Sequence, residues 1–487
     1  MASTDNQEGS ESPKRVADHN SSPLTVSLLP KIPLIVRTAL FNLLRISEQS
    51  KYLDLKTEVI LAVLRSYLNP TAPISITTAQ RLVMREIPIK GRIWISNYAS
   101  PTPPDTGVHA AVTTAITTLS PTATVPPMPS PAVTEAEWTG YRAAATNDEP
   151  LPSISEREKY DLLMKETTSP TTILYLHGGA FWLMDPATHR TTTKRLAKLT
   201  SGRCYSVRYR LAPQNPFPVA LIDALTSYLT LLYPPPDAYH TPVLPQHIVF
   251  AGDSAGGNLA LSLLQTLLTL HRTQTPILWH GVSYQVPLPA GLAVNSPWLD
   301  ITHSLPSCNA NANFDYLPSL DSQCRFEPLR PACPAWPTTP PRAMIYAHDN
   351  MVLHPLVSPL LAESWKGAPP VWLCTGRELL ADEDKFLAKR LWKDGVRVEF
   401  EEYEGMPHCF ALIFAGLGET KRCLEGWAEF ARRVVDGEEK IQSGFRIVRA
   451  KTLVEEELKP EGLSEYEIGW VRERIARRVR GEVEAKL

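Results

Sequence analysis

Apolar and polar residues near the start of the chain follow a helical spacing. In residues 34–46 and 53–68 the apolar side chains recur three or four positions apart, which lines one face of a helix. We interpret residues 23–80 as a helical cap segment that packs against the main body. An alternative interpretation is a lid that contacts a membrane surface through residues 24–46. Three basic residues interrupt that run, so we do not expect it to span a bilayer: Lys31, Arg37 and Arg45.

The pattern changes at Thr171, where short apolar runs begin to alternate with helical stretches. The runs are 173–176, 203–209, 248–251, 292–295, 371–374 and 396–403. The helical stretches between them include 191–200, 218–232, 256–270 and 383–394. Apolar strands that alternate with helices predict an α/β fold, in which helices cover both faces of a mostly parallel sheet.

Other segments depart from this alternation. Residues 92–96 predict a strand, and residues 135–141 predict its hairpin partner. The Pro/Thr-rich segment 100–133 between them has little apolar periodicity, and we interpret it as a mobile loop. Within the α/β domain, residues 81–435, the segment 301–345 shows no period and predicts an insertion.

The two ends of the chain differ from the domain between them. Residues 1–22 are polar, lack the apolar core of a secretory signal, and predict a disordered leader. Residues 436–487 predict a charged tail that ends in a helix over 465–487.

Composition narrows the classes of function. The chain has 487 residues, with 49 basic and 51 acidic side chains. This balance argues against a nucleic-acid-binding protein, which usually carries a basic excess. The seven cysteines are dispersed without a CxxC pair, which predicts reduced thiols and an intracellular, cytoplasmic location. The 45 prolines exceed the 24 glycines because many prolines fall in the predicted insertions.

Ser254 stands in a Gly-Asp-Ser-Ala-Gly sequence, residues 252–256, between an apolar strand and an apolar helix. The glycines permit a tight, strained turn, and that turn lifts the serine hydroxyl above the sheet at a helix N-terminus. In this context the sequence predicts a nucleophilic serine. An ordinary strand–helix turn is the alternative.

A second glycine-containing turn follows the run 173–176. Its backbone N–H groups, together with that of the residue after Ser254, would surround a developing alkoxide and form an oxyanion hole. The predicted donors are Gly178, Gly179, Ala180 and Ala255. A plain glycine turn is the alternative for this segment.

A nucleophilic serine needs a base and an acid. His408 follows the last predicted strand, and the chain order of serine, acid and histidine favours it as the base. Glu378 is the first carboxylate after the run 371–374, where it could reach and orient the histidine. Asp382 is the alternative acid, although a carboxylate that opens a helix also has a capping role.

Together these segments resemble the hormone-sensitive-lipase-like branch of the α/β-hydrolase superfamily, with Pro-rich inserts similar to its fungal-type members. The resemblance covers about 171–414. It rests on His177-Gly-Gly-Ala, Tyr209-Arg-Leu-Ala-Pro213, Gly252-Asp-Ser-Ala-Gly-Gly257, Ser296-Pro-Trp-Leu-Asp300, Glu378-Leu-Leu-Ala-Asp382 and Met406-Pro-His408. It implies an eight-stranded, mostly parallel sheet with an N-terminal helical cap. It also implies a catalytic role for Glu378, although glutamate replaces the family's usual aspartate there.

The resemblance further implies a serine esterase that acts on short acyl esters, acetyl esters especially, of a small apolar alcohol. No metal or cofactor is expected, since the sequence shows no cluster of metal ligands and no P-loop lysine. Two alternatives stay open. One is a non-catalytic small-ligand receptor of the same fold, and the other is a lactonase, thioesterase or amidase that uses the same triad.

Overall fold

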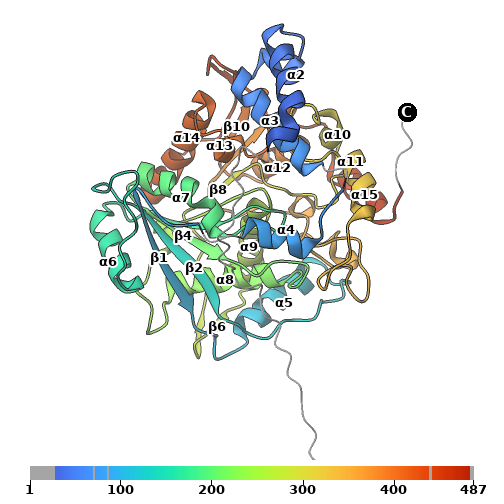
Figure 1. Cartoon of the computed structure of the whole chain (residues 1–487). Coiled ribbons are helices and arrows are strands. Elements are labelled where there is room, and N and C mark those ends of the chain that lie inside the picture. Colours follow the sequence, from blue (N-terminus) through green and yellow to red (C-terminus); the bar gives the residue numbers. More distant parts are fainter. Residues whose placement is uncertain (1–27, 70–71, 85–86, 438–440, 483–487) are drawn as a thin grey trace, which may run out of the picture.

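The computed structural model describes residues 28–69, 72–84, 87–437 and 441–482 (Figure 1). In this part of the chain ten strands form one sheet in the order β1-β2-β4-β3-β5-β8-β9-β10-β11-β12. The strands are β1 Ile93–Ser100, β2 Thr134–Tyr141, β3 Thr172–Leu176, β4 Arg203–Arg208, β5 Ile248–Asp253, β8 Gly291–Asn295, β9 Val371–Gly376, β10 Val398–Tyr403, β11 Gly444–Val448 and β12 Glu455–Glu457. From β4 to β11 neighbouring strands are parallel, and the antiparallel pairings lie at the two edges.

The prediction of a mostly parallel sheet is confirmed, but its size is wrong. Eight strands were expected, and β11 and β12 extend the sheet beyond β10. Both strands lie in the segment interpreted from the sequence as a charged tail. In β11, Phe445 and Val448 are buried, and this burial holds the segment against the sheet. A small hairpin, β6 Ile277–Trp279 with β7 Val282–Tyr284, lies outside the main sheet.

Helices cover both faces of the sheet. They are α5 Gly107–Leu119, α6 Glu156–Glu166, α7 Pro186–Thr200, α8 Val219–Leu232, α9 Ala255–Arg272, α12 Ala381–Lys393, α13 Phe410–Ile413, α14 Gly418–Val435 and α15 Ile468–Val479. Side chains of a strand alternate between the faces. In β3, Ile173 and Tyr175 join the core formed with α7 and α14, whereas Leu174 and Leu176 join the core formed with α8 and α9. Every β3 residue is therefore buried, as in a sheet covered on both sides.

Of the three N-terminal helices, the first two form a cap at one end of the molecule, and the third lies nearer its middle (Figure 1). They are α2 Ile32–Leu43, α3 Leu55–Leu68 and α4 Ile76–Val83. Helix α3 begins where Asp54 accepts the N–H of Thr57 at 2.7 Å. The two helices predicted over 34–46 and 53–68 are confirmed within two or three residues. The leader predicted over 1–22 lies outside the described residues. Within those that are described, no helix has both the length and the apolar character needed to cross a membrane.

The interpretation of residues 100–133 as a mobile loop is wrong for its first half. Helix α5 lies there, and its apolar residues Val108, Val112 and Ile116 are buried against α8 and α9. The threonines and prolines around the helix mask its short apolar stripe in the sequence. The predicted insertion, 301–345, contains the short helices α10 Ser307–Ala310 and α11 Leu320–Phe326.

The C-terminal helix is shorter than predicted: α15 ends at Val479, and residues 483–487 lie outside the described part. Val471 and Ile475 bury one side of it, whereas Trp470 is exposed. The described chain holds all seven cysteines as free thiols. An intracellular location stays a prediction.

Candidate active site

Ser254 occupies a tight turn between β5 and α9. Its backbone lies at φ 50° and ψ −122°, a conformation that residues other than glycine rarely adopt. The turn is crowded, since a Cβ atom on Gly256 would lie 2.0 Å from the carbonyl oxygen of Leu176. The Ser254 N–H donates to the Asn295 carbonyl at 3.1 Å, which ties the turn to β8. The strand–turn–helix context predicted for this serine is therefore present.

Asp253, the residue before the serine, is fully enclosed and anchors the neighbouring loop. Its Oδ1 accepts the Tyr175 hydroxyl at 2.7 Å and the Gly178 N–H at 3.2 Å. Burial would raise the pKa of this carboxyl, but His189 beside it outweighs burial and holds the pKa below its ordinary value. Because its one N–H is taken by Asp253, Gly178 does not fit the oxyanion role that the sequence suggested.

The other three predicted donors remain. Among the described residues, the N–H groups of Gly179, Ala180 and Ala255 have no hydrogen-bond acceptor. Gly179 and Ala180 both have positive φ, 103° and 53°. Ala180 is not a glycine, so its left-handed backbone is strained and its Cβ is nevertheless accommodated. Unpaired N–H groups are costly near a core, and these three are suited to receive an oxyanion.

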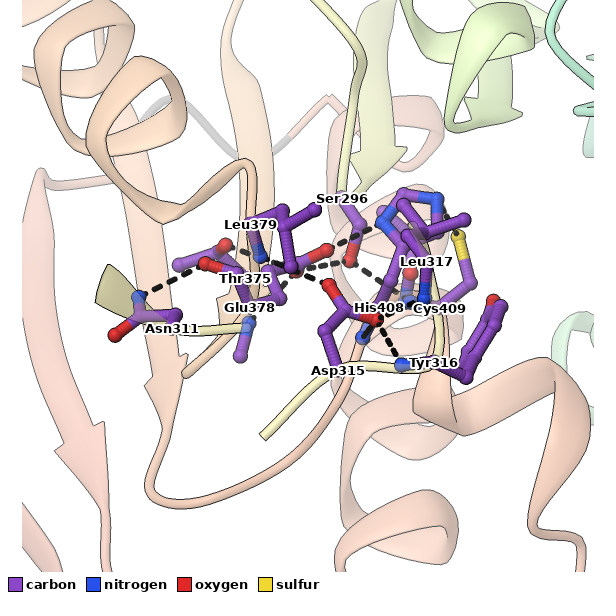
Figure 2. A network of polar contacts seen from close by, with 12 residues as sticks. Ser296, Asn311, Asp315, Tyr316, Leu317, Thr375, Glu378, Leu379, His408 and Cys409 are labelled. Atoms are coloured by element: carbon purple, nitrogen blue, oxygen red, sulfur yellow. Dashed lines mark hydrogen bonds and ion pairs between the residues drawn. The ribbon is translucent and has the colours of Figure 1, made fainter. Parts of the chain in front are cut away.

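His408 and Glu378 form a buried pair. His408 Nδ1 contacts Glu378 Oε2 directly, and Glu378 has no exposed surface (Figure 2). Burial by itself would lower the pKa of His408, but Glu378 raises it above the ordinary value for histidine. Burial would raise the pKa of Glu378, but His408 together with hydrogen bonds from Ser296 and the Gly376 N–H holds the pKa of this carboxyl below its ordinary value. The pair thus suits an ionised carboxylate that orients an imidazole.

Asp382, the alternative acid, lies elsewhere. Its Oδ2 accepts the Ser307 N–H at 2.9 Å and the Tyr466 hydroxyl at 3.3 Å. Glu383 accepts the N–H groups of Leu299 and Asp300 at 3.1 and 2.8 Å. Asp382 and Glu383 therefore hold neighbouring loops, and the structure brings Glu378 to the histidine.

Two residues that sequence reasoning left without a role complete the surroundings of the pair. Ser296 donates to Glu378 Oε1 at 2.6 Å and accepts the Cys409 N–H at 3.2 Å. Asp315 accepts the Leu379 N–H at 2.8 Å and faces the His408 N–H at 3.4 Å (Figure 2). Ser296 belongs to a segment that the resemblance singled out, which was a usable signal. Asp315 carried no signal, because it lies in an insertion without a pattern.

The distal nitrogen of His408 has an unexpected neighbour. Its Nε2 lies 3.4 Å from Cys409 Sγ, and no hydrogen bond joins it to Ser254 in the described chain. Burial raises the pKa of the Cys409 thiol well above the ordinary value, so the group is a neutral S–H. Sequence reasoning treated Cys409 only as a dispersed thiol.

The cap and the insertion meet beside this site. Arg65 of α3 donates to the carbonyl oxygens of Asp315 and Asn313 at 2.8 and 2.7 Å. Arg330 of the insertion lies over the Trp182 ring, 5.3 Å from its centroid. The insertion therefore contacts both the cap and the loop that follows β3.

Comparisons with known proteins identify the family and the fold. A family model described as alpha/beta hydrolase fold matches residues 173–412. An esterase of Acinetobacter venetianus is 32% identical over 267 residues, which cover 55% of this chain and 76% of the relative. An acetyl-hydrolase of Streptomyces hygroscopicus is 30% identical over 262 residues, which cover 54% of this chain and 75% of the relative.

A solved structure of EstE5, soaked with p-nitrophenyl butyrate, has a TM-score of 0.51 and 22% identity, and the match covers 77% of this chain and 99% of that one. At that identity the likeness shows the fold alone. Both relatives named above are bacterial, so they do not support the expected fungal type.

Proposed function

The chain belongs to the family with the alpha/beta hydrolase fold and is a carboxylic ester hydrolase, and we propose that Ser254, His408 and Glu378 are its catalytic triad. The observation that carries the proposal is the buried contact between His408 and Glu378. Strands β5, β9 and β10 belong to one parallel block, so their carboxyl ends reach the same edge of the sheet. Ser254 follows the first of these strands, Glu378 the second and His408 the third.

The reaction uses two acyl transfers. Ser254 Oγ attacks the ester carbonyl carbon while its proton passes to His408 Nε2. The carbon–oxygen bond to the alcohol breaks, and the alcohol leaves with the proton from His408. A water molecule then attacks the acyl carbon, His408 takes the proton of that water, and Ser254 leaves the carbon and regains a proton. Glu378 stays ionised throughout and stabilises the imidazolium.

The oxyanion formed in both steps would be held by Gly179, Ala180 and Ala255. Their N–H groups have no acceptor among the described residues, so no existing hydrogen bond has to break before they bind the oxyanion. A donor of this kind contributes roughly 2.7–4 kcal/mol to lowering the barrier. The N-terminus of α9, which begins at Ala255, adds a favourable dipole.

The substrates are small esters. Within that class we propose short acyl groups, acetyl especially, on an apolar alcohol, as in the hormone-sensitive-lipase-like branch that the motifs resemble. The acetyl-hydrolase name of one relative supports this proposal. Arg330 of the insertion also supports it, because it contacts both the Trp182 ring and the Ile74 carbonyl of the cap segment, and these segments then leave less room for a long chain.

The decisive experiment is a hydrolysis series with nitrophenyl esters from acetate to dodecanoate. We expect kcat/KM to be highest for the short esters and Ser254→Ala to lower it by at least about 10³-fold. The exposed Ser283, changed to alanine, serves as the matched control and should act as wild type. Full activity of Ser254→Ala would overturn the triad. Tight binding of a small apolar ligand without hydrolysis would favour the receptor interpretation.

A further inference from the structure

Helix α2 presents aliphatic side chains outward. None of its twelve residues is buried. The exposed aliphatic residues of α2 and its flanks are Leu29, Ile32, Val36, Leu40, Leu43, Leu44 and Ile46. Most are three or four positions apart, so they lie on one face of the helix. Val36 and Leu43 are 59% and 69% exposed, which is unusual for such residues in a helix of a globular protein.

Polar contacts fix which face of α2 points outward. On the side toward α3, Asn42 Nδ2 donates to Glu58 Oε2 at 2.6 Å. Lys31 lies over the Tyr67 ring, 4.9 Å from its centroid, and donates to the Ser66 carbonyl. Leu34, Ile35 and Phe41 are half-buried like Asn42, so α2 carries apolar residues on both of its faces, and the aliphatic groups of the outer face are left exposed.

The charges around this face have one sign. Residues 28–46 contain Lys31, Arg37 and Arg45 and no acidic residue. We propose that α2 lies on an anionic lipid surface, with its aliphatic face among the acyl chains and the exposed Arg37 and Arg45 at the headgroups. A second copy of the chain fits less well, because a symmetric contact through α2 would bring equal positive charges together.

The length and place of α2 suit this arrangement. Twelve helical residues span about 18 Å, less than the hydrocarbon core of about 30 Å, so the helix would lie along the surface. Figure 1 shows α2 at an extremity of the molecule, where the folded domain does not obstruct a flat surface. This inference does not depend on the proposed triad.

The test is sedimentation of the full chain with vesicles of phosphatidylcholine, alone or mixed with phosphatidylglycerol. We expect binding to the mixed vesicles, and Val36→Ser with Leu40→Ser should lower the partition coefficient at least about tenfold. Arg37→Gln with Arg45→Gln should lower it roughly tenfold on the anionic vesicles alone. The control changes Leu244 and Val282, both 50% exposed and outside α2, to serine.

Three outcomes would overturn the inference. One is no binding of the wild-type chain to either vesicle, and another is equal loss in the control variant. A third is that light scattering shows a wild-type dimer and that Val36→Ser with Leu40→Ser converts it to a monomer. The exposed face of α2 would then bind a second copy of the chain and not a lipid surface. Hydrolysis of nitrophenyl acetate without vesicles reports separately on the active site.

A different observation concerns Asp315, whose carboxylate joins three loops. Its Oδ1 accepts the N–H groups of Tyr316 and Leu317 at 2.7 and 3.2 Å, within the insertion. The same oxygen faces the N–H of His408, and Oδ2 accepts the N–H of Leu379. Asp315 has no exposed surface, and among the described residues backbone N–H groups hold it in place of an ion pair.

We infer that Asp315 is a positioning residue. Through it, the insertion holds the loops that carry Glu378 and His408 in fixed positions relative to each other. The inference rests on the proposed function. Its carboxylate holds the residue after Glu378 and the backbone of His408 itself, so both loops move if it is lost. Burial raises the pKa of Asp315, and its ionised form favours the protonated form of His408, as do Glu378 and Asp253. His303, the Tyr316 phenol and the Cys409 thiol are also titratable groups near this imidazole.

The test is Asp315→Asn, with Asp382→Asn as a matched control in the first turn of α12. We expect Asp315→Asn to lower kcat/KM between about ten- and a hundredfold. The acid limb of the kcat/KM profile should move to lower pH, because His408 loses a nearby negative charge. An unmoved limb, or an equal shift in Asp382→Asn, would overturn the inference. If Ser254→Ala stays active, the proposed function itself fails.

Discussion

His408 Nε2 lies 3.4 Å from the sulfur of Cys409, the next residue along the chain. Cys409 has φ 47°, so its backbone is left-handed and its thiol turns back to the imidazole. The lone pair that should accept the Ser254 proton is therefore shared with a neutral S–H. In this arrangement the thiol would compete with the proposed nucleophile for the proposed base.

Removing the thiol should speed the reaction. We expect Cys409→Ala to raise kcat/KM about two- to tenfold, since one weak hydrogen bond to Nε2 is lost. Cys409→Ser should lower kcat/KM, because a hydroxyl is a stronger donor than a thiol. The measurement is hydrolysis of nitrophenyl acetate by both variants. A large loss in Cys409→Ala would mean that the thiol assists the base.

The choice between the two acids can be tested directly. Glu378→Gln should lower kcat/KM by about 10³–10⁴-fold, because an amide beside Nδ1 favours the wrong tautomer of His408. Asp382→Asn should stay within about threefold of wild type, since Asp382 contacts Ser307 and Tyr466 instead. The opposite order of the two variants would contradict the assignment.

The pH dependence follows from the raised pKa of His408. The base is active only when neutral, so kcat/KM should rise with pH and reach half its plateau above pH 6.5, the ordinary value for histidine. Glu378 holds that pKa up, and residual activity of Glu378→Gln should therefore rise at a lower pH than wild type. A midpoint for the wild type below the ordinary value would contradict the role of Glu378.

The oxyanion loop offers a matched pair of substitutions. Ala180→Gly keeps the N–H and relieves the left-handed backbone, so activity should stay within about threefold of wild type. Gly179→Ala places a Cβ 2.2 Å from the Leu183 carbonyl oxygen and should lower kcat by about 10²–10³-fold. Equal effects of the two variants would argue against a backbone role for this loop. Circular dichroism would show whether Gly179→Ala still folds.

Because helix α5 packs into the core, removing one of its buried side chains should lower the stability of the protein. Ile116 is fully buried, so Ile116→Ala should lower the free energy of unfolding by about 2–5 kcal/mol in urea. Thr118, exposed on the same helix, should change it by less than about 0.5 kcal/mol when replaced by alanine. If Ile116→Ala leaves the free energy of unfolding unchanged, the result would support the interpretation of residues 100–133 as a mobile loop.

Particular residues show how far prediction from sequence reached. The turn at Ser254 was predictable because the apolar strand, the glycines and the helix that build it are contiguous in the chain. The same holds for the strand before His408. Helix α5 was missed because Pro- and Thr-rich flanks hid its apolar stripe, and β11 was missed because one short strand amid charges has little periodicity of its own. Both elements are ordered by the core that they join.

By itself, the sequence determined the α/β alternation and the order of serine, acid and histidine, since these are patterns of neighbouring residues. Only the tertiary structure decided that Glu378 rather than Asp382 meets His408, that Gly178 is engaged by Asp253, and that Asp315 faces both catalytic loops. The physical reason is distance along the chain. The insertion packs against the carboxyl ends of the parallel strands and brings Asp315 Oδ2 to 2.8 Å from the Leu379 nitrogen. No local sequence pattern predicts that contact.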